Sequence, residues 1–592
     1  MNIFNDRFSE IKKASEPLYK SPKSVQETIE ILKISESGIF EVADGKYSKT
    51  YRFSDVNYAT RSEDEQESFF QRYCRCLNSF DCTFKITVNN KNKDMDVLRN
   101  EVMLKYRNDG FDKMRESYNR IIEEKILEGR QGIEQERYLT ITIERKNFEE
   151  AKAQFATIEA SMFRSFAELG SKLTPLTGNE RLKILHDYYR LGREDEFNFD
   201  IRQGRITGTD FRNEICNTRI KYHPDYFENE GKVGRVLFIK KYPTYLSDRF
   251  FTELTFLPVH SVTSVDVVPV PKDLTMKMLQ KKYLGIESDI IKQQRTRNRN
   301  NDFSSDISYA TRQKKKDIEE IMNNVRENDE SLYYVSVTMI VMADDRDELE
   351  SICETVDSIA KGAGCAVDTC MYKQREAVNT TLPIGVRQIE TMRTMLTQSL
   401  AVLMPFNVQE LCDRNGIYYG VNQISKNIIV GNRKKLLNGN GFIFGVSGAG
   451  KSFQAKMEMG SVLLSTDDNV IAVDPMNEYE DVTEKYNGTY INISTNTRNY
   501  INPMDMDVWN LDVLDSKGWV RDKCQFMLSI CEQIMKEITP QQRSIISRCV
   551  KDLYMDIARS REKYVPTMEN LYNRLLEQED KEARDVALGL EI

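Results

Sequence analysis

The chain lacks any apolar run of the about 20 residues that a bilayer-spanning helix needs. Residues 1–17 are charged throughout and lack the apolar core of a secretory signal. Histidine is scarce, with three residues, and the 11 cysteines show no doubled C-x-x-C spacing of a structural zinc site. These absences predict a cytoplasmic protein with reduced thiols, which reaches a membrane only through partners.

An excess of positive charge is also missing. The net charge of −8 excludes a protein whose whole surface binds nucleic acid, although a local basic patch remains open. At 592 residues the chain is too long for one hydrophobic core, so about two to four domains are expected.

Two segments in the first 400 residues repeat a strand followed by a helix. Residues 137–143 alternate polar and apolar side chains before a helical stretch over 148–170, and residues 333–341 and 345–361 repeat the layout. Residues 112–128 predict a further helix with apolar residues on one face. We therefore expect an N-terminal α+β domain over residues 1–400, built either from a duplicated module or from generic α+β patterning.

A long polar segment over residues 274–330 contains few helix breakers and predicts a helical arm. It carries two basic runs, Lys292, Arg295, Arg297 and Arg299 in the first and residues 312–316 in the second. One interpretation is a pair of solvated helices with an exposed tip. The other is a basic arm that makes a weak contact with a partner or with nucleic acid.

After this arm, residues 380–407 predict a hinge into a new domain, because Pro383 and Gly385 break the regular pattern. The sequence changes character from here on, and residues 401–592 predict a second domain.

The second domain contains the pattern G-x-x-x-x-G-K-S at Gly445–Ser452. A short apolar run over 441–444, interpreted as a strand, precedes it, and a helical stretch over 453–466 follows. This context predicts an ATP-binding P-loop, in which backbone amides and the helix N-terminus face the phosphates. We expect the contacts to ATP to come from Gly445, Ser447, Gly448, Ala449, Gly450, Lys451, Ser452 and Phe453.

Two of these residues have distinct expected roles. Lys451 should reach the β- and γ-phosphates, and the Ser452 hydroxyl should bind Mg²⁺. Downstream, residues 469–474 predict a buried strand that ends at Asp474. Glu478 follows, and it either orients or deprotonates the attacking water as a catalytic residue or is a solvent-facing loop carboxylate.

No apolar run ending in the Walker-B acid occurs downstream of residue 480. The chain instead predicts a helical subdomain from about residue 516, with helices over 521–537, 539–559 and 567–578. Residues 587–592 stop without a polar tail. The expected fold class is therefore α/β: N-terminal α+β domains, then a RecA-like P-loop motor domain with a helical insertion, incomplete at its C-terminus.

Several motifs surround the P-loop in a fixed order. They are Pro405-Phe406, Gly416–Gly420, Asn422 with Ser425-Lys426-Asn427, Asn438–Asn440, Asp474–Tyr479 and Asn502–Asp505. In order and spacing the chain resembles the VirB-type ATPase of type IV secretion systems, in the form carried by conjugative elements of Gram-positive bacteria.

The resemblance implies an N-terminal domain that docks on inner-membrane channel proteins and a motor that works as a hexamer under the membrane. It also implies hydrolysis of ATP, with Mg²⁺, to build the channel or pilus and to support DNA transfer. Lys451 and Ser452 match the family's nucleotide residues, and Glu478 matches its acid after the second strand. The family's Walker-B pair, glutamine motif and arginine finger have no matching positions.

Three functions therefore remain open. The chain is the assembly ATPase of a conjugation apparatus, a coupling-protein-like pump for single-stranded DNA, or a docking subunit that binds ATP without hydrolysing it.

Overall fold

The structure is a computed structural model, and it describes most of the chain. The described residues are 22–92, 102–128, 133–217, 219–243, 245–299, 309–327, 329–413, 415–423, 427–494, 497, 499–510 and 518–591. Contacts between Cα atoms divide the chain into two compact units, Met1–Ala472 and Val473–Ile592. The boundary expected near residue 400 stays a prediction.

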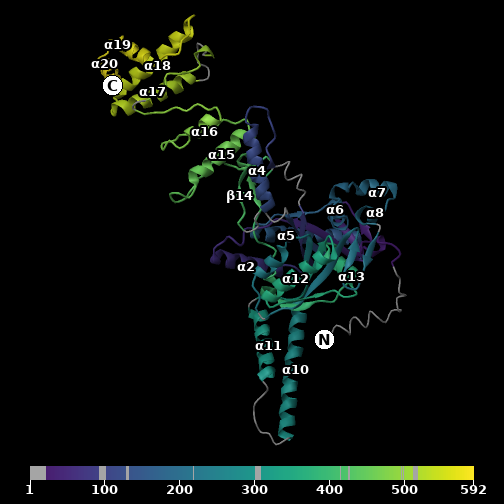
Figure 1. Cartoon of the computed structure of the whole chain (residues 1–592). Coiled ribbons are helices and arrows are strands. Elements are labelled where there is room, and N and C mark those ends of the chain that lie inside the picture. Colours follow the sequence, from purple (N-terminus) through teal and green to yellow (C-terminus); the bar gives the residue numbers. More distant parts are fainter. Residues whose placement is uncertain are drawn as a thin grey trace. The chain divides into compact units, whose positions relative to one another are not determined.

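Thirteen strands among the described residues form one antiparallel sheet in the first unit (Figure 1). Its main path runs β1-β2-β3-β5-β4-β10-β11-β9-β8-β7. The strands are β1 (Lys33–Ile34), β2 (Ile39–Ala43), β3 (Lys46–Phe53), β4 (Thr83–Asn92), β5 (Ile133–Glu144), β6 (Leu173–Pro175), β7 (Ile220–Tyr222), β8 (Phe227–Asn229), β9 (Lys232–Lys241), β10 (Ser261–Val270), β11 (Leu332–Ala343), β12 (Ala366–Thr369) and β13 (Arg393–Leu396).

The two halves of this sheet repeat the same order of elements. The first half runs β2, β3, α2 (Glu63–Asn78), β4, α4 (Asp112–Glu128), β5, α5 (Phe148–Leu169), β6. The second runs β8, β9, α9 (Arg249–Thr255), β10, α10 (Lys272–Arg299), α11 (Tyr309–Glu327), β11, α12 (Arg346–Gly362), β12.

The strand pairing repeats as well. In the first half β5 lies between β3 and β4, and β6 pairs with β3. In the second half β11 lies between β9 and β10, and β12 pairs with β9. The halves meet where β4 pairs with β10. Helix α4 and the arm α10–α11 therefore occupy equivalent places in the two halves.

Apolar side chains cover one face of the sheet. The largest cluster joins alternate residues of β5 and β11 to α2, α5, α9, α12 and α14 (Thr397–Ala401). The strand–helix pairs expected from the sequence are confirmed, and side-chain caps begin their helices. Asn147 accepts a hydrogen bond from the Glu150 amide at the start of α5, and Asp345 does the same for Glu348 at the start of α12.

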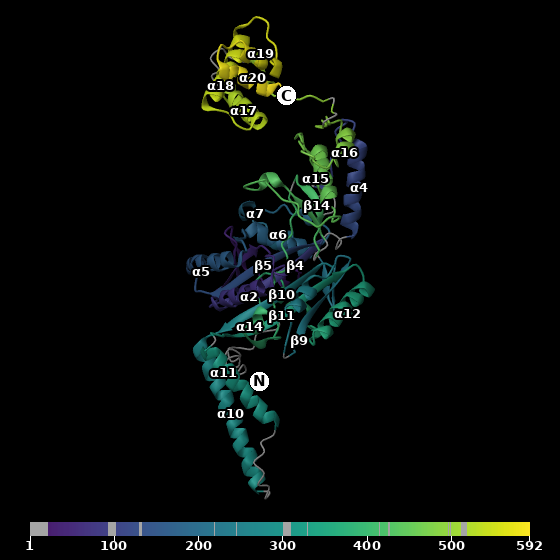
Figure 2. The ribbon, with the colours of Figure 1, turned by 90° about the vertical axis from the view of Figure 1, so that its left-hand side faces the viewer.

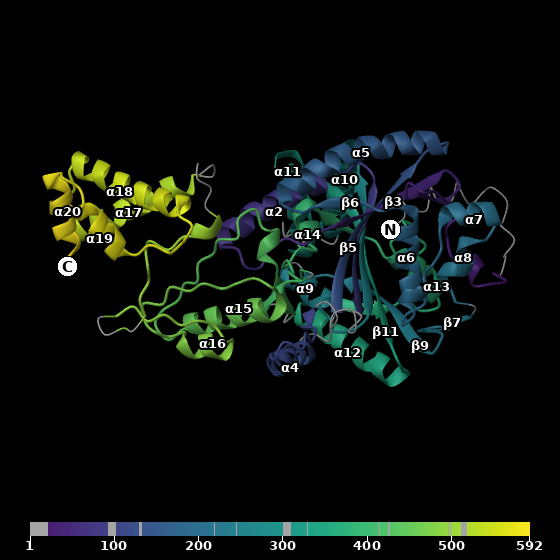
Figure 3. The same cartoon turned by 90° about the horizontal axis from the view of Figure 1, so that it is seen from above.

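The opposite face is flanked by a second cluster, which includes α6 (Gly178–Tyr189), α7 (Ile201–Thr207), α8 (Phe211–Ile215) and α13 (Gln374–Thr381). Figure 3 looks along the sheet, with α9 and α14 on one side and α6 and α13 on the other. The centre of this second face is polar, because β3, β4, β5 and β10 present hydroxyl groups and one lysine there.

The segment over residues 380–386, here called the strap, leaves the last turn of α13 and crosses this polar centre. Its carbonyl groups accept hydrogen bonds from the hydroxyls of Ser48 (to Ile384, 2.6 Å), Thr142 (to Gly385, 3.0 Å) and Ser264 (to Thr381, 2.5 Å). Gly385 has a φ of 95°, and a Cβ there would lie 2.6 Å from the Ser48 Cβ. Only glycine fits this close approach.

Two buried cations also donate hydrogen bonds to strap carbonyls. Lys85 donates to Thr380, Leu382 and Val386, and desolvation lowers its pKa to about 8. Arg181 donates to Pro383 and Ile384 at 3.3 Å each and lies 3.9 Å from the centre of the Phe40 ring. Desolvation lowers the Arg181 pKa to about 9, which is still high enough for the guanidinium to be charged at neutral pH.

The hinge expected over residues 380–407 is wrong, because Thr380–Ile384 are buried on the sheet. The end of this segment is fixed too. The Asp55 carboxylate accepts the amides of Asn407 (2.8 Å) and Val408 (3.2 Å), and Arg137 donates to the Pro405 carbonyl and pairs with Asp55. Pro383 and Gly385 break regular structure here without separating domains, because buried donors replace the lost backbone hydrogen bonds.

The expected helical arm is the antiparallel pair α10 and α11, which runs away from the sheet in Figures 1 and 2. Leu279 and Val325 are buried near its base. Farther out, Lys315 of α11 pairs with Glu287 of α10 at 3.1 Å and lies over the Tyr283 ring. The side chains of Arg297 and Arg299 lie outside the described part of the chain.

The second unit contains a short helix, α16 (Glu480–Lys485), and a compact helical bundle. The bundle is formed by α17 (Trp519–Met535), α18 (Pro540–Arg559), α19 (Met568–Leu576) and α20 (Lys581–Leu590). The first three confirm the sequence prediction, including the Thr539 capping box with Pro540 in the first turn. Helix α20 was not predicted. Across the described residues of both units, no helix is long and apolar enough to span a membrane.

His260, directly before β10, generates a prediction about acid stability. It is 7% exposed, and neither ring nitrogen has a hydrogen-bond partner among the described residues. Desolvation lowers its pKa to about 4, against opposing attraction from Asp187. Between this pH and about 6.5 the unfolded chain binds the proton and the folded chain does not. The folded state therefore loses stability as the pH is lowered through this window, by up to about 3 kcal/mol.

We therefore expect His260→Leu to gain thermal stability relative to the wild type when the pH is lowered from about 7.5 to about 5. Melting temperatures of both proteins at the two pH values measure this difference. A parallel fall in both melting temperatures would show that folding does not lower the pKa of His260.

Candidate nucleotide-binding site

The P-loop forms a tight turn in front of α15 (Lys451–Ser465). Gly448 and Gly450 have φ angles of 79° and 88°, which L-amino acids rarely adopt, and Gly450 is the N-cap of the helix. The Ala449 amide donates to the Val446 carbonyl at 3.2 Å and closes the turn. The glycine spacing of the sequence therefore corresponds to a real backbone requirement.

Lys451 folds back over this loop. Its Nζ donates to the carbonyls of Gly445 (2.9 Å) and Val446 (3.0 Å). A Cβ on Gly445 would lie 3.2 Å from the Ala449 Cβ and 3.3 Å from the Lys451 Cγ, so glycine leaves room for the lysine stem. A loop of this form with an ammonium group and a helix N-terminus fits a polyphosphate.

The residues of the P-loop are suited to Mg²⁺ that is bound together with a polyphosphate. The part of the chain that the structure describes contains no group of three or more His, Cys, Asp or Glu residues that could hold a metal by itself. A P-loop needs none, because Mg²⁺ takes a hydroxyl such as that of Ser452 together with phosphate and water oxygens.

The two strands expected beside the P-loop are wrong. Residues 441–444 and 469–474 contain no strand, and Phe442, Phe444 and Ile471 are 85%, 87% and 93% exposed. An apolar run indicates that a segment is suited to burial, but a strand also needs a neighbour for its amides and carbonyls. Within the described residues no strand pairs with either segment.

The middle of α15 is anchored to a neighbouring hairpin, β14 (Ile417–Val421) and β15 (Ile428–Gly431). The Tyr419 hydroxyl donates to Glu458 of α15 at 2.9 Å. Arg433 donates both to Glu458, at 3.0 Å, and to the Tyr419 hydroxyl, at 3.1 Å. The Gly416–Gly420 motif, which contains Tyr419, therefore positions the P-loop helix. Sequence analysis missed Arg433 and Glu458, because no local spacing relates them.

Asp474 and Glu478 belong to the second unit. The Asp474 carboxylate accepts the amides of Met476 (3.3 Å) and Tyr479 (2.8 Å), which forms the turn before α16. Glu478 is exposed. Since Lys451 lies in the first unit, the catalytic role of Glu478 stays a prediction.

The motif Asn502–Asp505 has a structural explanation within the second unit. Met504 is fully buried in the helical bundle, and its carbonyl accepts a hydrogen bond from the Tyr554 hydroxyl. The Asn502 amide group donates to Pro566, and Lys523 donates to the carbonyls of Pro503 and Asp505. The motif thus attaches the chain to its helices.

The model of the TraG P-loop domain family matches residues 413–586. The TraG P-loop domain match includes the hairpin β14–β15, the P-loop, α15 and most of the helical bundle. It supports a P-loop ATPase of conjugative transfer within an α/β chain, with an N-terminal sheet and C-terminal helices. It does not separate a VirB-type ATPase from a coupling protein. A search of curated proteins finds no match to the chain.

The P-loop should tolerate little change at Gly448. Alanine meets no atom within 4 Å there, but its Cβ disfavours a φ of 79° by about 1–2 kcal/mol. We expect Gly448→Ala to weaken ATP binding about 10-fold while the melting temperature changes little, since the loop is exposed. Fluorescence titration with an ATP analogue measures the affinity.

Gly285→Ala in α10 is the matched control, because nothing lies within 4 Å and its backbone has no positive φ. It should leave ATP binding unchanged. Equal affinities for Gly448→Ala and the control would contradict the requirement for a left-handed residue in the loop.

Proposed function

We propose that the chain is the ATP-driven motor subunit of a conjugative type IV secretion system, of the VirB type. In this proposal ATP hydrolysis energises assembly of the channel or pilus and supports DNA transfer. The chain works as a hexamer at the inner face of the cell membrane, held there by inner-membrane channel proteins. The P-loop at the N-terminus of α15, inside the TraG P-loop domain match, is the observation that carries the proposal.

The chemistry assigned to each residue follows from its position. The loop amides and the Lys451 ammonium bind the phosphates and offset their charge. Ser452 binds Mg²⁺, which supplies a further positive charge on the β- and γ-phosphates when it is bound. Glu478 is proposed to orient the attacking water.

Removing the Lys451 ammonium tests this proposal. We expect Lys451→Ala to bind ATP about 10- to 100-fold more weakly, because a charge-assisted hydrogen bond contributes about 1.5–3 kcal/mol. ATP turnover and conjugative transfer should be lost, while the melting temperature stays near that of the wild type. Lys277→Ala, on the exposed surface of α10, is the control and should behave as the wild type.

Normal transfer with Lys451→Ala would contradict the motor function. An ATP-dependent rise in melting temperature without turnover would instead favour a docking subunit that binds ATP without hydrolysing it.

A second candidate, a pump for single-stranded DNA, is favoured by the arm. Residues 292–316 contain eight Lys or Arg against two Asp, which gives +6 in a chain of net charge −8. Lys292 and Arg295 are exposed on α10. Such a concentration of charge suits the phosphates of a nucleic acid.

Neutralising Arg295, Arg297 and Arg299 together tests this second candidate. Binding of a single-stranded oligonucleotide should weaken, and the slope of log K against log salt should fall by about 2, since each phosphate contact contributes about 0.7. Fluorescence anisotropy over a range of salt concentrations measures it, with Lys277→Ala as control. An unchanged slope would remove the arm from any nucleic-acid contact.

A further inference from the structure

The insertion between β4 and β5 reaches the P-loop helix. β4 ends at Asn92 and β5 begins at Ile133, and between them α4 lies beside α15 in Figures 1 and 2. The apolar face of α4 packs on the hairpin next to the P-loop helix. The cluster consists of Val102, Tyr118, Ile122, Ile126, Ile428 and Val430.

Arginines from this insertion bind the C-terminal end of α15. The last carbonyls of a helix have no partner within it. Here Arg115 Nε donates to the Leu464 carbonyl at 3.1 Å, and Arg107 donates to the carbonyls of Ser465 (2.7 Å) and Thr466 (3.2 Å). Positive charge is also favourable at the negative end of the helix dipole.

The geometry of Arg115 is fixed from both sides. It is completely buried, and its Nη atoms donate to Asp109 (2.6 and 2.5 Å) and Asp112 (2.8 Å). The hydrogen bond from Arg115 holds the pKa of Asp109 well below its usual range. The guanidinium is therefore charged and has one defined orientation.

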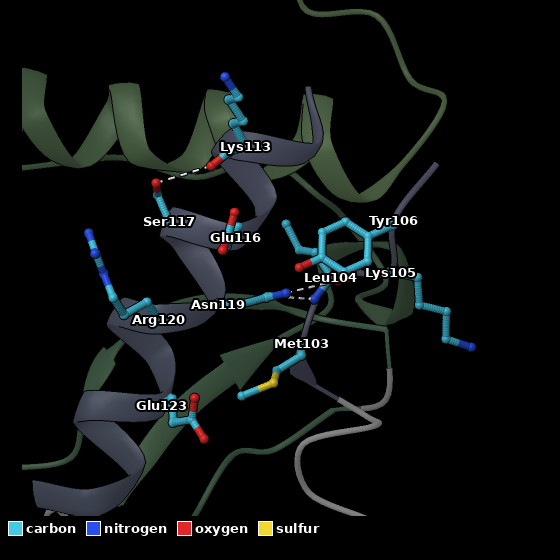
Figure 4. Close-up of a pocket in the computed structure, with 10 residues that line it drawn as sticks. All are labelled: Met103, Leu104, Lys105, Tyr106, Lys113, Glu116, Ser117, Asn119, Arg120 and Glu123. Carbon is cyan, nitrogen blue, oxygen red and sulfur yellow. Dashed lines mark hydrogen bonds between the residues drawn. The ribbon is translucent and has the colours of Figure 1, made fainter. Parts of the chain in front are cut away.

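The segment that carries Arg107 is held along α4. Figure 4 shows Asn119 of α4 pointing at Leu104, where its side chain accepts the Leu104 amide at 2.8 Å and donates to the Leu104 carbonyl at 2.9 Å. Asp112 also accepts the Arg107 amide at 3.0 Å. Arg107, which is 35% exposed, is thus aligned with the helix end that it binds.

We infer that Arg107 and Arg115 are positioning residues of the nucleotide site, which couple it to the sheet. The P-loop helix is about 22 Å long, with the phosphate-binding loop at one end and the two arginines at the other. α4 lies in the insertion between two paired strands, and displacement of α15 moves α4 through these arginines. This inference rests on the proposed binding of ATP, and coupling of this kind is reciprocal.

Hydrogen exchange with and without ATP tests the coupling. In the wild type, ATP should slow amide exchange in residues 451–465 and also in residues 112–128. In Arg107→Ala the first turn of α15 should still respond, the response of α4 should be lost, and ATP affinity should fall about 3- to 10-fold. The melting temperature should change little, because Arg107 is partly exposed.

Two further variants separate positioning from a general structural effect. Arg107→Lys keeps a charge and a donor at the helix end, so it should recover part of the affinity. Arg202→Ala removes an arginine whose side chain is 76% exposed and paired with Glu36, and should change neither readout.

The outcomes distinguish this inference from the proposed function. If the wild type binds ATP but α4 does not respond and Arg107→Ala binds ATP normally, the coupling is overturned and the ATP site stands. If the wild type does not bind ATP, the proposed function fails. Exchange at the last turn of α15 without nucleotide then still tests the contact itself: equal rates in Arg107→Ala and the wild type would overturn it.

Discussion

The polar centre of the sheet imposes the constraint on which the rest of the first unit depends. Among the described residues, the Leu382 carbonyl of the strap accepts a backbone amide, that of Ile384, and burying the other strap carbonyls without donors would cost several kcal/mol. Arg181, Lys85 and the hydroxyls of the sheet supply those donors. Without the strap, Lys85 would lose the three hydrogen bonds that it makes there, and Arg181 would keep those to Gly38 and Ser48. A change on either side therefore leaves buried polar groups with fewer partners.

The position of the next part of the first unit derives from this arrangement. After the strap, β13 pairs with β11, and the Asp55–Arg137 pair fixes residues 405–408 on the sheet. Only then does the chain enter the hairpin that supports α15. The hairpin also packs against α4, which belongs to the insertion between β4 and β5.

Features with local causes could be predicted from the sequence. The P-loop glycines, the helices over 112–128, 148–170 and 539–559, and the Thr539 cap each depend on residues within a few positions of one another. The strap was mistaken for a hinge because its hydrogen-bond donors, such as Lys85 and Arg181, lie about 200 to 300 residues away. Arg107 and Arg115 could not be predicted for the same reason, because the carbonyls that they bind are about 350 residues away in the chain.

The TraG P-loop domain match starts at residue 413 and therefore does not cover the sheet. For the preceding residues the repeated topology provides the organising principle. In one half the insertion between the third and fourth strands is α4, and in the other it is the basic arm α10–α11. Two equivalent positions thus carry elements of opposite design, one packed on the nucleotide-binding part and one extended into solvent.

The contact between α4 and α15 also sets an order of events during synthesis. Arg115 leaves the ribosome 349 residues before the Leu464 carbonyl that it binds. At about 5–20 residues per second, this interval lasts about 20–70 s. Ile428 of β15 is made 302 residues after Ile126, so for about 15–60 s the apolar side chains of α4 have no partner from β15. The nascent chain exposes an apolar helix face during this time. A fragment that ends after the sheet would keep this surface bare, and aggregation of such a fragment would reflect the missing helix partner rather than a defect of the sheet.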